Sequence, residues 1–364
     1  MKISYHNNAK ILGKSIGENE SAYIMSNSKA VQLAQALNGS DSLAAPLVFL
    51  APMSGVTDLP FRRLVARFGT SATVSEMVAC DALAQARPDM VRRAEGEGLA
   101  PFIMQLAGRE AHWMAEGARL AEAAGADIID INMGCPARQV TGGYSGSALM
   151  RNLDHAADLI AATVQATSKP VTLKMRLGWD DESRNAPALA QIAEQLGVSM
   201  VTVHGRTRCQ FYKGKADWEA VADVVATVNI PVVVNGDIHS PIDASHALAE
   251  SGAAGVMIGR AALGQPWLLA EVSAALTGKS FAVPNAIEIA AAVDRWYEEC
   301  LALYGERLGV QVARKHLAAF IDHFCNDTST ARALRGEVCR MAEASSVRRA
   351  MRQFFLSNEQ EAAA

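Results

Sequence analysis

The 364-residue sequence lacks the long apolar run that a membrane protein needs. Its longest uninterrupted run of apolar residues covers ten positions, residues 44–53, whereas a membrane-spanning helix needs about 20. The first 20 residues contain no continuous apolar segment like that of a secretory signal peptide. We therefore expect a cytoplasmic protein that does not enter a membrane.

Closely spaced cysteines are also missing. Neighbouring cysteines are at least 14 positions apart, so no CxxC pair exists. This spacing excludes a zinc ribbon and gives no sign of a disulfide framework. We expect reduced thiols and no bound metal, and any cysteine with a chemical role must act alone. The six are Cys80, Cys135, Cys209, Cys300, Cys325 and Cys339.

A strong excess of one charge is absent, because the formal net charge is only −4. This balance argues against indiscriminate binding of polyanions. Residues 306–356 differ, with nine Lys and Arg against five Asp and Glu, a local charge of +4 (9 − 5). Such a segment is either a solvated helical surface or a contact for nucleic acid. The candidate phosphate contacts there are Arg314, Lys315, Arg348, Arg349 and Arg352.

The sequence is rich in apolar residues, at 50% of the chain, which is enough for a large core. From residue 47 onward, short apolar runs alternate with Ala-rich amphipathic segments, a pattern that predicts a parallel β/α protein. Eight such units fit a closed (β/α)8 TIM barrel. An open doubly wound sheet is the alternative, although the G-x-G-x-x-G fingerprint after the first strand is missing. The expected strands cover residues 48–53, 72–78, 101–107, 128–134, 171–178, 200–206, 231–237 and 255–260.

The pattern changes on both sides of this region. We expect residues 1–45 to form an amino-terminal extension, with a short helix near 27–37 and no assigned chemistry. Residues 46–283 would form the barrel. Residues 284–358 show helical patterns at 285–304, 309–324 and 329–355 with no strand between them, which predicts a small carboxy-terminal helical bundle.

Polar residues end almost every expected strand. In a β/α barrel the carboxyl ends of the strands meet at one face, where functional residues cluster. Lys174 is notable because it lies within an apolar strand, where an unpaired ammonium would be costly to bury. Together these residues predict a polar site. They are Ser54, Gln105, Asn132, Lys174, Arg176, His204, Arg206, Arg208, Asn235, Asp237 and Arg260.

The last two expected strands end in Asn-Gly-Asp and Ile-Gly-Arg. Gly236 and Gly259 free backbone N–H groups and Arg260 adds donors, at the place where such barrels bind a phosphate. The alternative is that the glycines only permit tight turns. A phosphate site together with Gln105 and Lys174 fits flavin mononucleotide (FMN), because the amide and the ammonium can bind the polar edge of a flavin ring.

Cys135 follows the fourth expected strand in a Gly-Cys-Pro loop. A free cysteine is most often a small buried hydrophobe, but this one lies at the catalytic end of the barrel. An unperturbed thiol is mostly protonated near neutral pH and can act as an acid, whereas a nearby cation such as Arg138 favours the thiolate. The residues alone leave open whether Cys135 donates a proton or attacks as a nucleophile.

In combination, several segments resemble the tRNA-dihydrouridine synthase family, and most closely its bacterial B-type branch. The likeness covers about residues 46–356. The segments are LAPMSGVTDLPFRRL, DINMGCPARQVTGGYSGSALM, TLKMRLGWDD, VTVHGRTR, VNGDI and MIGRAALGQPW.

The resemblance implies an FMN-dependent barrel and a helical tRNA-binding domain, which reduce the C5–C6 bond of D-loop uridines with NADPH as reductant. By position, Cys135 would protonate uracil C5. Asn132, Arg138, Arg206 and Arg208 would face the substrate. The implied flavin contacts are Pro52, Met53, Ser54, Gln105, Lys174 and His204, and the implied phosphate contacts are Asn235, Gly236, Asp237, Gly259 and Arg260.

One segment departs from the family pattern. Residues 137–144, after Cys135 and Pro136, are less basic than in many bacterial relatives, and Arg138 is the one cation kept there. The alternatives to a tRNA-modifying enzyme are a flavin barrel that acts on small molecules and a regulator that binds nucleic acid without catalysis. We expect the protein to act as a monomer.

Overall fold

A computed structural model describes residues 19–43, 45–69, 72–325 and 327–363. Nine parallel strands form one sheet within these residues, and the additional pairing of β2, at one end of the strand order, with β4 closes the sheet into a barrel. The predicted TIM barrel is therefore confirmed. The strands are β1 (Leu47–Leu50), β2 (Thr73–Val74), β3 (Val78–Ala79), β4 (Phe102–Ala107), β5 (Ile128–Met133), β6 (Val171–Arg176), β7 (Met200–His204), β8 (Val232–Asn235) and β9 (Gly255–Ile258).

The second expected strand, 72–78, is interrupted. Strands β2 and β3 pair in turn with β4, and residues 75–77 between them leave the regular ladder. The two short strands thus occupy one of the eight positions of the barrel. Their interruption turns Glu76, which is only 4% exposed, toward the loop that follows β1.

Helices surround the barrel because most of them bury one apolar face against the strands. Some of them begin at a capping residue: Asn152 accepts from the backbone of His155, and Ser240 accepts from Asp243. The helices of the barrel are α2 (Leu59–Arg67), α3 (Cys80–Ala84), α4 (Pro88–Arg93), α5 (Ala111–Ala123), α6 (Arg138–Thr141), α7 (Leu153–Gln165), α8 (Ala186–Gln195), α9 (Glu219–Thr227), α10 (Pro241–Ser251) and α11 (Leu268–Leu276), with 3-10 turns η1 (Gly146–Arg151) and η2 (Arg260–Ala262).

Helix α1 (Asn19–Asn38) is longer than the helix expected near residues 27–37 and packs on the barrel. Leu33 is 1% exposed and joins an apolar cluster that includes Ile103, Ile128 and Met200. These residues lie toward the amino ends of their strands, opposite the predicted site. Helix α1 therefore closes the far end of the barrel. The first part of the expected extension, residues 1–18, lies outside the described residues.

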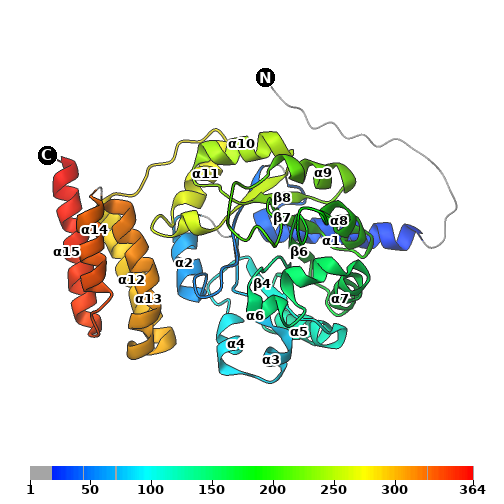
Figure 1. Cartoon of the computed structure of the whole chain (residues 1–364), viewed down its shortest axis with the longest axis horizontal. Helices are drawn as coiled ribbons and strands as arrows, with labels where there is room; N and C mark the ends of the chain where they lie inside the picture. The colour runs from blue at the N-terminus through cyan, green and yellow to red at the C-terminus, as the bar shows by residue number, and fades with distance from the viewer. Residues whose placement is uncertain (1–18, 44, 70–71, 326, 364) are drawn as a thin grey trace.

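The carboxy-terminal helices form a bundle beside the barrel, next to α2 (Figure 1). The expected helix at 329–355 is wrong, because the chain breaks between Val338 and Ala344 into two helices. The break is needed because α14 packs on α13 whereas α15 packs mainly on α12. The bundle consists of α12 (Ala286–Tyr304), α13 (Glu306–Phe324), α14 (Thr328–Val338) and α15 (Ala344–Ala363). No helix of the described chain is long and apolar enough to cross a membrane.

A buried polar contact links the two domains. The Tyr304 hydroxyl at the end of α12 donates to Asp58 at 3.0 Å, and Asp58 also caps α2 by accepting from the backbone of Phe61. Burial raises the pKa of the Asp58 carboxyl to about 6, although these two hydrogen bonds oppose the shift. The folded protein therefore holds a proton on Asp58 at a pH where the unfolded chain has released it.

Replacing this carboxyl gives a pH-dependent prediction. Because the unfolded carboxyl titrates near pH 4 and the folded one near pH 6, wild-type stability falls as pH rises through that window. Asp58→Asn keeps the helix cap and removes this loss, so the variant gains about 1–3 kcal/mol over wild type between pH 4 and pH 7. Urea unfolding at a series of pH values measures the difference. The exposed Asp154→Asn is the control, and a constant difference between Asp58→Asn and wild type would contradict the assignment.

Candidate active site

A cavity of about 530 Å³ opens at the carboxyl ends of the barrel strands. Its walls come from loops distant in sequence, because parallel strands bring their carboxyl ends to one face. Most of the predicted site residues meet there. Those that line it are Pro52, Met53, Ser54, Gln105, Asn132, Cys135, Lys174, His204, Arg206, Asn235, Gly236, Asp237, Gly259 and Arg260.

The floor of the cavity is a chain of buried polar side chains. Asp130 accepts from Gln105 Nε2 at 2.7 Å and from the Thr172 hydroxyl at 2.6 Å. Gln105 Oε1 in turn accepts from Asn132 Nδ2 at 2.7 Å. Burial raises the pKa of Asp130, while these donors and the nearby Lys174 favour its ionised form. The network fixes the orientation of the Gln105 amide below the cavity.

Asp130 and Thr172 were missed by the sequence prediction, which considered only residues at strand ends. Asp130 and Thr172 lie two positions before the predicted residues of β5 and β6, and Asp130 is aligned with Gln105 and Thr172 with Asp130. A carboxylate in the otherwise apolar run of β5 was the signal that could have identified Asp130.

Lys174 is buried and has a defined partner. Its Nζ donates to Asn235 Oδ1 at 2.9 Å, and Asn235 Nδ2 donates to the Met257 carbonyl at 2.7 Å. Burial lowers the pKa of Lys174 to about 8, and the positive charge of Arg176 adds to the shift. The ammonium thus stays charged near neutral pH and lies on the cavity wall, where it can stabilise negative charge on a bound group.

The Cys135 loop is attached to the floor. Asn132 Oδ1 accepts from the Cys135 backbone N–H at 3.0 Å, and the Cys135 carbonyl accepts from the Ser147 hydroxyl at 2.9 Å. Gly146 has φ +60°, and a Cβ there would come within 2.8 Å of the Cys135 carbonyl oxygen, so this close turn requires glycine. The thiol itself is half-buried on the cavity wall.

The surroundings of Cys135 favour a protonated thiol. Burial raises its pKa above the usual value, although a backbone hydrogen bond from Ala137 and the charges of Arg176 and Lys174 act in the opposite direction. A thiol of this kind keeps its proton near neutral pH. The same cations stabilise the thiolate once the proton has left, which is the behaviour required of a proton donor.

Two buried arginines hold loops of the cavity wall. Arg176 donates to the carbonyls of Gly134, Thr207 and Phe211, each at 2.9 Å. Arg206, which is 2% exposed, donates to Asp237 Oδ2 at 2.5 Å.

Arg206 also donates to the Gly214 carbonyl at 2.7 Å. The expected substrate contact Arg206 and the expected phosphate contact Asp237 are therefore bonded to each other and organise the loop.

Several predicted cations lie outside the cavity. Arg138 is exposed on α6, and the Arg208 guanidinium stacks on the rings of Trp179 and Phe211 at 4.6 and 4.9 Å. Arg348 pairs with Asp294 at 2.6 Å, and Lys315 donates to the Gly55 carbonyl.

The remaining two predicted phosphate contacts on α15, Arg349 and Arg352, are exposed. Arg314 Nη2 donates to the Met341 carbonyl at 3.4 Å.

Tyr212 is a site residue that the sequence prediction missed. Its ring is 52% exposed on the cavity wall and lies 4.7 Å from the Arg260 guanidinium and 5.6 Å from that of Arg176. The prediction considered strand ends, whereas Tyr212 lies further along the loop after β7. An exposed aromatic in that basic loop was the available signal.

Comparison with known proteins places the chain in a family. The model of the family described as "Dihydrouridine synthase (Dus)" matches residues 49–359. A "Probable tRNA-dihydrouridine synthase" of Rhodobacter capsulatus is 51% identical over 86% of this chain and 96% of that protein. One of Rickettsia conorii is 47% identical over 85% and 93%, and "tRNA-dihydrouridine synthase B" of Xanthomonas axonopodis pv. citri is 45% identical over 77% and 85%. These matches confirm the resemblance seen in the motifs, and the chain belongs to the dihydrouridine synthase family of oxidoreductases.

Proposed function

We propose that this protein is an FMN-dependent tRNA-dihydrouridine synthase that reduces the C5–C6 double bond of D-loop uridines, with NADPH as the reductant. The observation that carries the proposal is the meeting of Cys135, Lys174 and Gln105 on one cavity at the barrel mouth. The names of the relatives support tRNA as the substrate. Such a reaction belongs to the cytoplasm, where tRNA and reduced nicotinamide are both present.

The residues of the cavity fit FMN. Its volume of about 530 Å³ lies within the usual range for small-molecule sites. A Cβ at Gly259 would meet only Met53 and Ala51, at 3.7 and 3.8 Å, so the glycine leaves room beside the exposed Arg260 for a phosphate. Gln105 and Lys174 would hold the polar edge of the ring, and Met53 and Met257 offer apolar contact. When bound, the flavin supplies the hydride for uracil C6.

Residues of the protein supply the second hydrogen that the uracil receives. Cys135 donates its proton to uracil C5, and the resulting thiolate is stabilised by the charges of Arg176 and Lys174 and by the Ala137 backbone. Asn132 holds the backbone of Cys135 and so keeps the thiol at the cavity wall. Arg176 joins the Cys135 loop to the Tyr212 loop, and the two loops would border a base in the cavity and limit the access of water.

A uridine in a folded tRNA must leave its stack to enter this cavity, which costs a few kcal/mol. The RNA therefore needs anchoring contacts elsewhere on the protein. We assign these to the helical bundle, where Arg349 and Arg352 lie three positions apart on α15 and are both exposed. Arg348 contributes less, because Asp294 and Glu298 already pair with it.

The proton-donor role of Cys135 is tested by Cys135→Ala. The variant should bind FMN and accept electrons from NADPH as wild type does, because the thiol takes part only in reduction of the uridine. Reoxidation of the reduced flavin by tRNA should slow by roughly 10²–10⁴-fold, the usual contribution of a positioned general acid. Anaerobic single-turnover absorbance measures this rate, with the exposed Cys209→Ala as control. Equal rates in wild type and Cys135→Ala would rule out the thiol as the donor.

The role of Lys174 is tested by Lys174→Met. Loss of a buried charge-assisted contact worth roughly 1.5–3 kcal/mol should weaken FMN binding by about 10- to 100-fold. Titration of flavin-free protein with FMN, followed by quenching of flavin fluorescence, gives the dissociation constant. The exposed Lys279→Met serves as the control. An unchanged dissociation constant for Lys174→Met would exclude the proposed contact.

The tRNA contacts are tested by the double variant Arg349→Ala/Arg352→Ala. Each phosphate contact releases bound counterions, so removing two should reduce the slope of log Kd against log salt by about 1–2. FMN content should not change, because α15 is remote from the cavity. Arg119→Ala, on α5 of the barrel, is the matched control. A slope equal to that of wild type would show that the two arginines form only a solvated surface.

A further inference from the structure

The loop between β1 and α2, residues 51–58, carries three of the expected flavin contacts, and one of its residues, Gly55, is held from both sides. The Gly55 N–H donates to Glu76 Oε1 at 2.5 Å, and the Gly55 carbonyl accepts from Lys315 Nζ at 2.6 Å. Glu76 belongs to the barrel, whereas Lys315 belongs to α13 of the helical bundle, 260 positions further along the chain. The loop is thus fixed jointly by the two domains.

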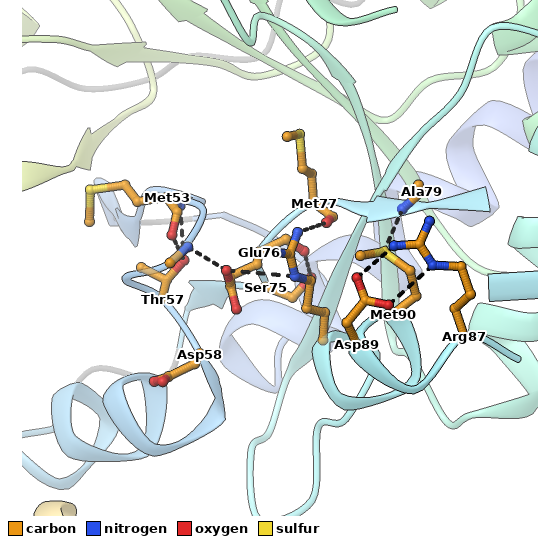
Figure 2. A network of polar contacts seen from close by, with 12 residues as sticks. Met53, Thr57, Asp58, Ser75, Glu76, Met77, Ala79, Arg87, Asp89 and Met90 are labelled. Carbon is orange, nitrogen blue, oxygen red and sulfur yellow. Dashed lines mark hydrogen bonds and ion pairs between the residues drawn. The ribbon is translucent and has the colours of Figure 1, made fainter. Parts of the chain in front are cut away.

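The contact on the barrel side is made by a buried carboxylate, that of Glu76. Figure 2 shows the Glu76 carboxylate directed toward the turn that contains Met53 and Thr57. Glu76 is 4% exposed, and Arg93 Nε lies 3.8 Å from its carboxylate. The turn is closed internally, because the Met53 N–H donates to the Thr57 hydroxyl at 2.9 Å and the Thr57 N–H donates to the Met53 carbonyl at 3.0 Å. The contacts that hold Gly55 in place therefore also hold the turn from Met53 to Thr57.

The contact on the bundle side is made by Lys315, an exposed residue on a helix that packs against α2. His316, next to Lys315, is fully buried, and its ring lies 4.4 Å from that of Phe61 on α2. The Tyr304 hydroxyl donates to Asp58 at the end of the same loop. A Cβ at Gly55 would lie 3.3 Å from Lys315 Nζ, so the approach of the ammonium is close. The sequence prediction assigned Lys315 to a tRNA phosphate, but its ammonium bonds to the barrel domain.

We propose that Lys315 is a positioning residue that holds the flavin-contact loop from the helical bundle. By binding the Gly55 carbonyl opposite Glu76, it sets where Met53 and Ser54 stand on the cavity wall. Retention of FMN then depends on how the bundle docks on the barrel. The inference rests on the proposed function in so far as it takes FMN to be the occupant of the cavity.

The test compares Lys315→Met, Lys315→Arg and the control Arg307→Met, an exposed cation on the same helix α13. FMN is titrated into each flavin-free protein, and the visible circular dichroism of the bound flavin is recorded. Lys315→Met should raise the FMN dissociation constant about five- to tenfold and alter the dichroism, because a charged donor to the loop is lost. The FMN dissociation constant of Lys315→Arg should stay within about twofold of the wild-type value. That of Arg307→Met should equal the wild-type value.

A second measurement follows the loop without cofactor. Hydrogen exchange of the peptide that covers residues 51–57 should be faster in flavin-free Lys315→Met than in wild type, because one of the two hydrogen bonds that hold Gly55 is removed. An FMN dissociation constant and an exchange rate equal to those of wild type would overturn the positioning role. Failure of wild type itself to bind FMN would instead overturn the proposed function, and the inference with it.

Discussion

The buried ammonium of Lys174 is the constraint on which the site depends. A charge inside a barrel is tolerated only where neighbouring strands supply partners. Asn235 supplies the acceptor, and the Met257 carbonyl fixes Asn235 in turn. Inside the barrel, these polar contacts join strands β6, β8 and β9 just below the cavity. The Gln105 and Asp130 pair does the same for β4 and β5, so the floor is rigid before any ligand enters.

Only a few contacts attach the loops that carry Cys135 and Tyr212 to this floor. Asn132 joins the floor to the backbone of Cys135, and Arg176 joins the Cys135 loop to the loop that carries Tyr212. The opposite wall, with Met53, is attached to Glu76 in the barrel and to the helical bundle. The wall that carries Cys135 and Tyr212 is thus held by the barrel alone. The wall that carries Met53 is held both by the barrel and by the helical bundle, to which we assign tRNA binding. Under the proposed function, this arrangement would couple placement of the base to retention of the flavin.

The barrel could be predicted from the sequence because parallel strands buried on both faces appear as apolar runs. The site residues could be predicted because strand ends meet at one face, and most of them line the cavity, although their roles stay predictions. The features that could not be predicted depend on contacts between distant segments. Charge alone selected Lys315 and Arg348, but it gives no information on acceptors such as the Gly55 carbonyl and Asp294 that lie beside them in space. The break between α14 and α15 likewise follows from packing on two different helices.

The most direct measurement is mass spectrometry of D-loop fragments from an unmodified tRNA that has been incubated with the purified protein, FMN and NADPH. The proposed chemistry predicts that a uridine-containing fragment becomes heavier by two hydrogens, and that this gain disappears when NADPH is omitted. Consumption of NADPH with every D-loop uridine unchanged in mass would contradict the proposed reaction.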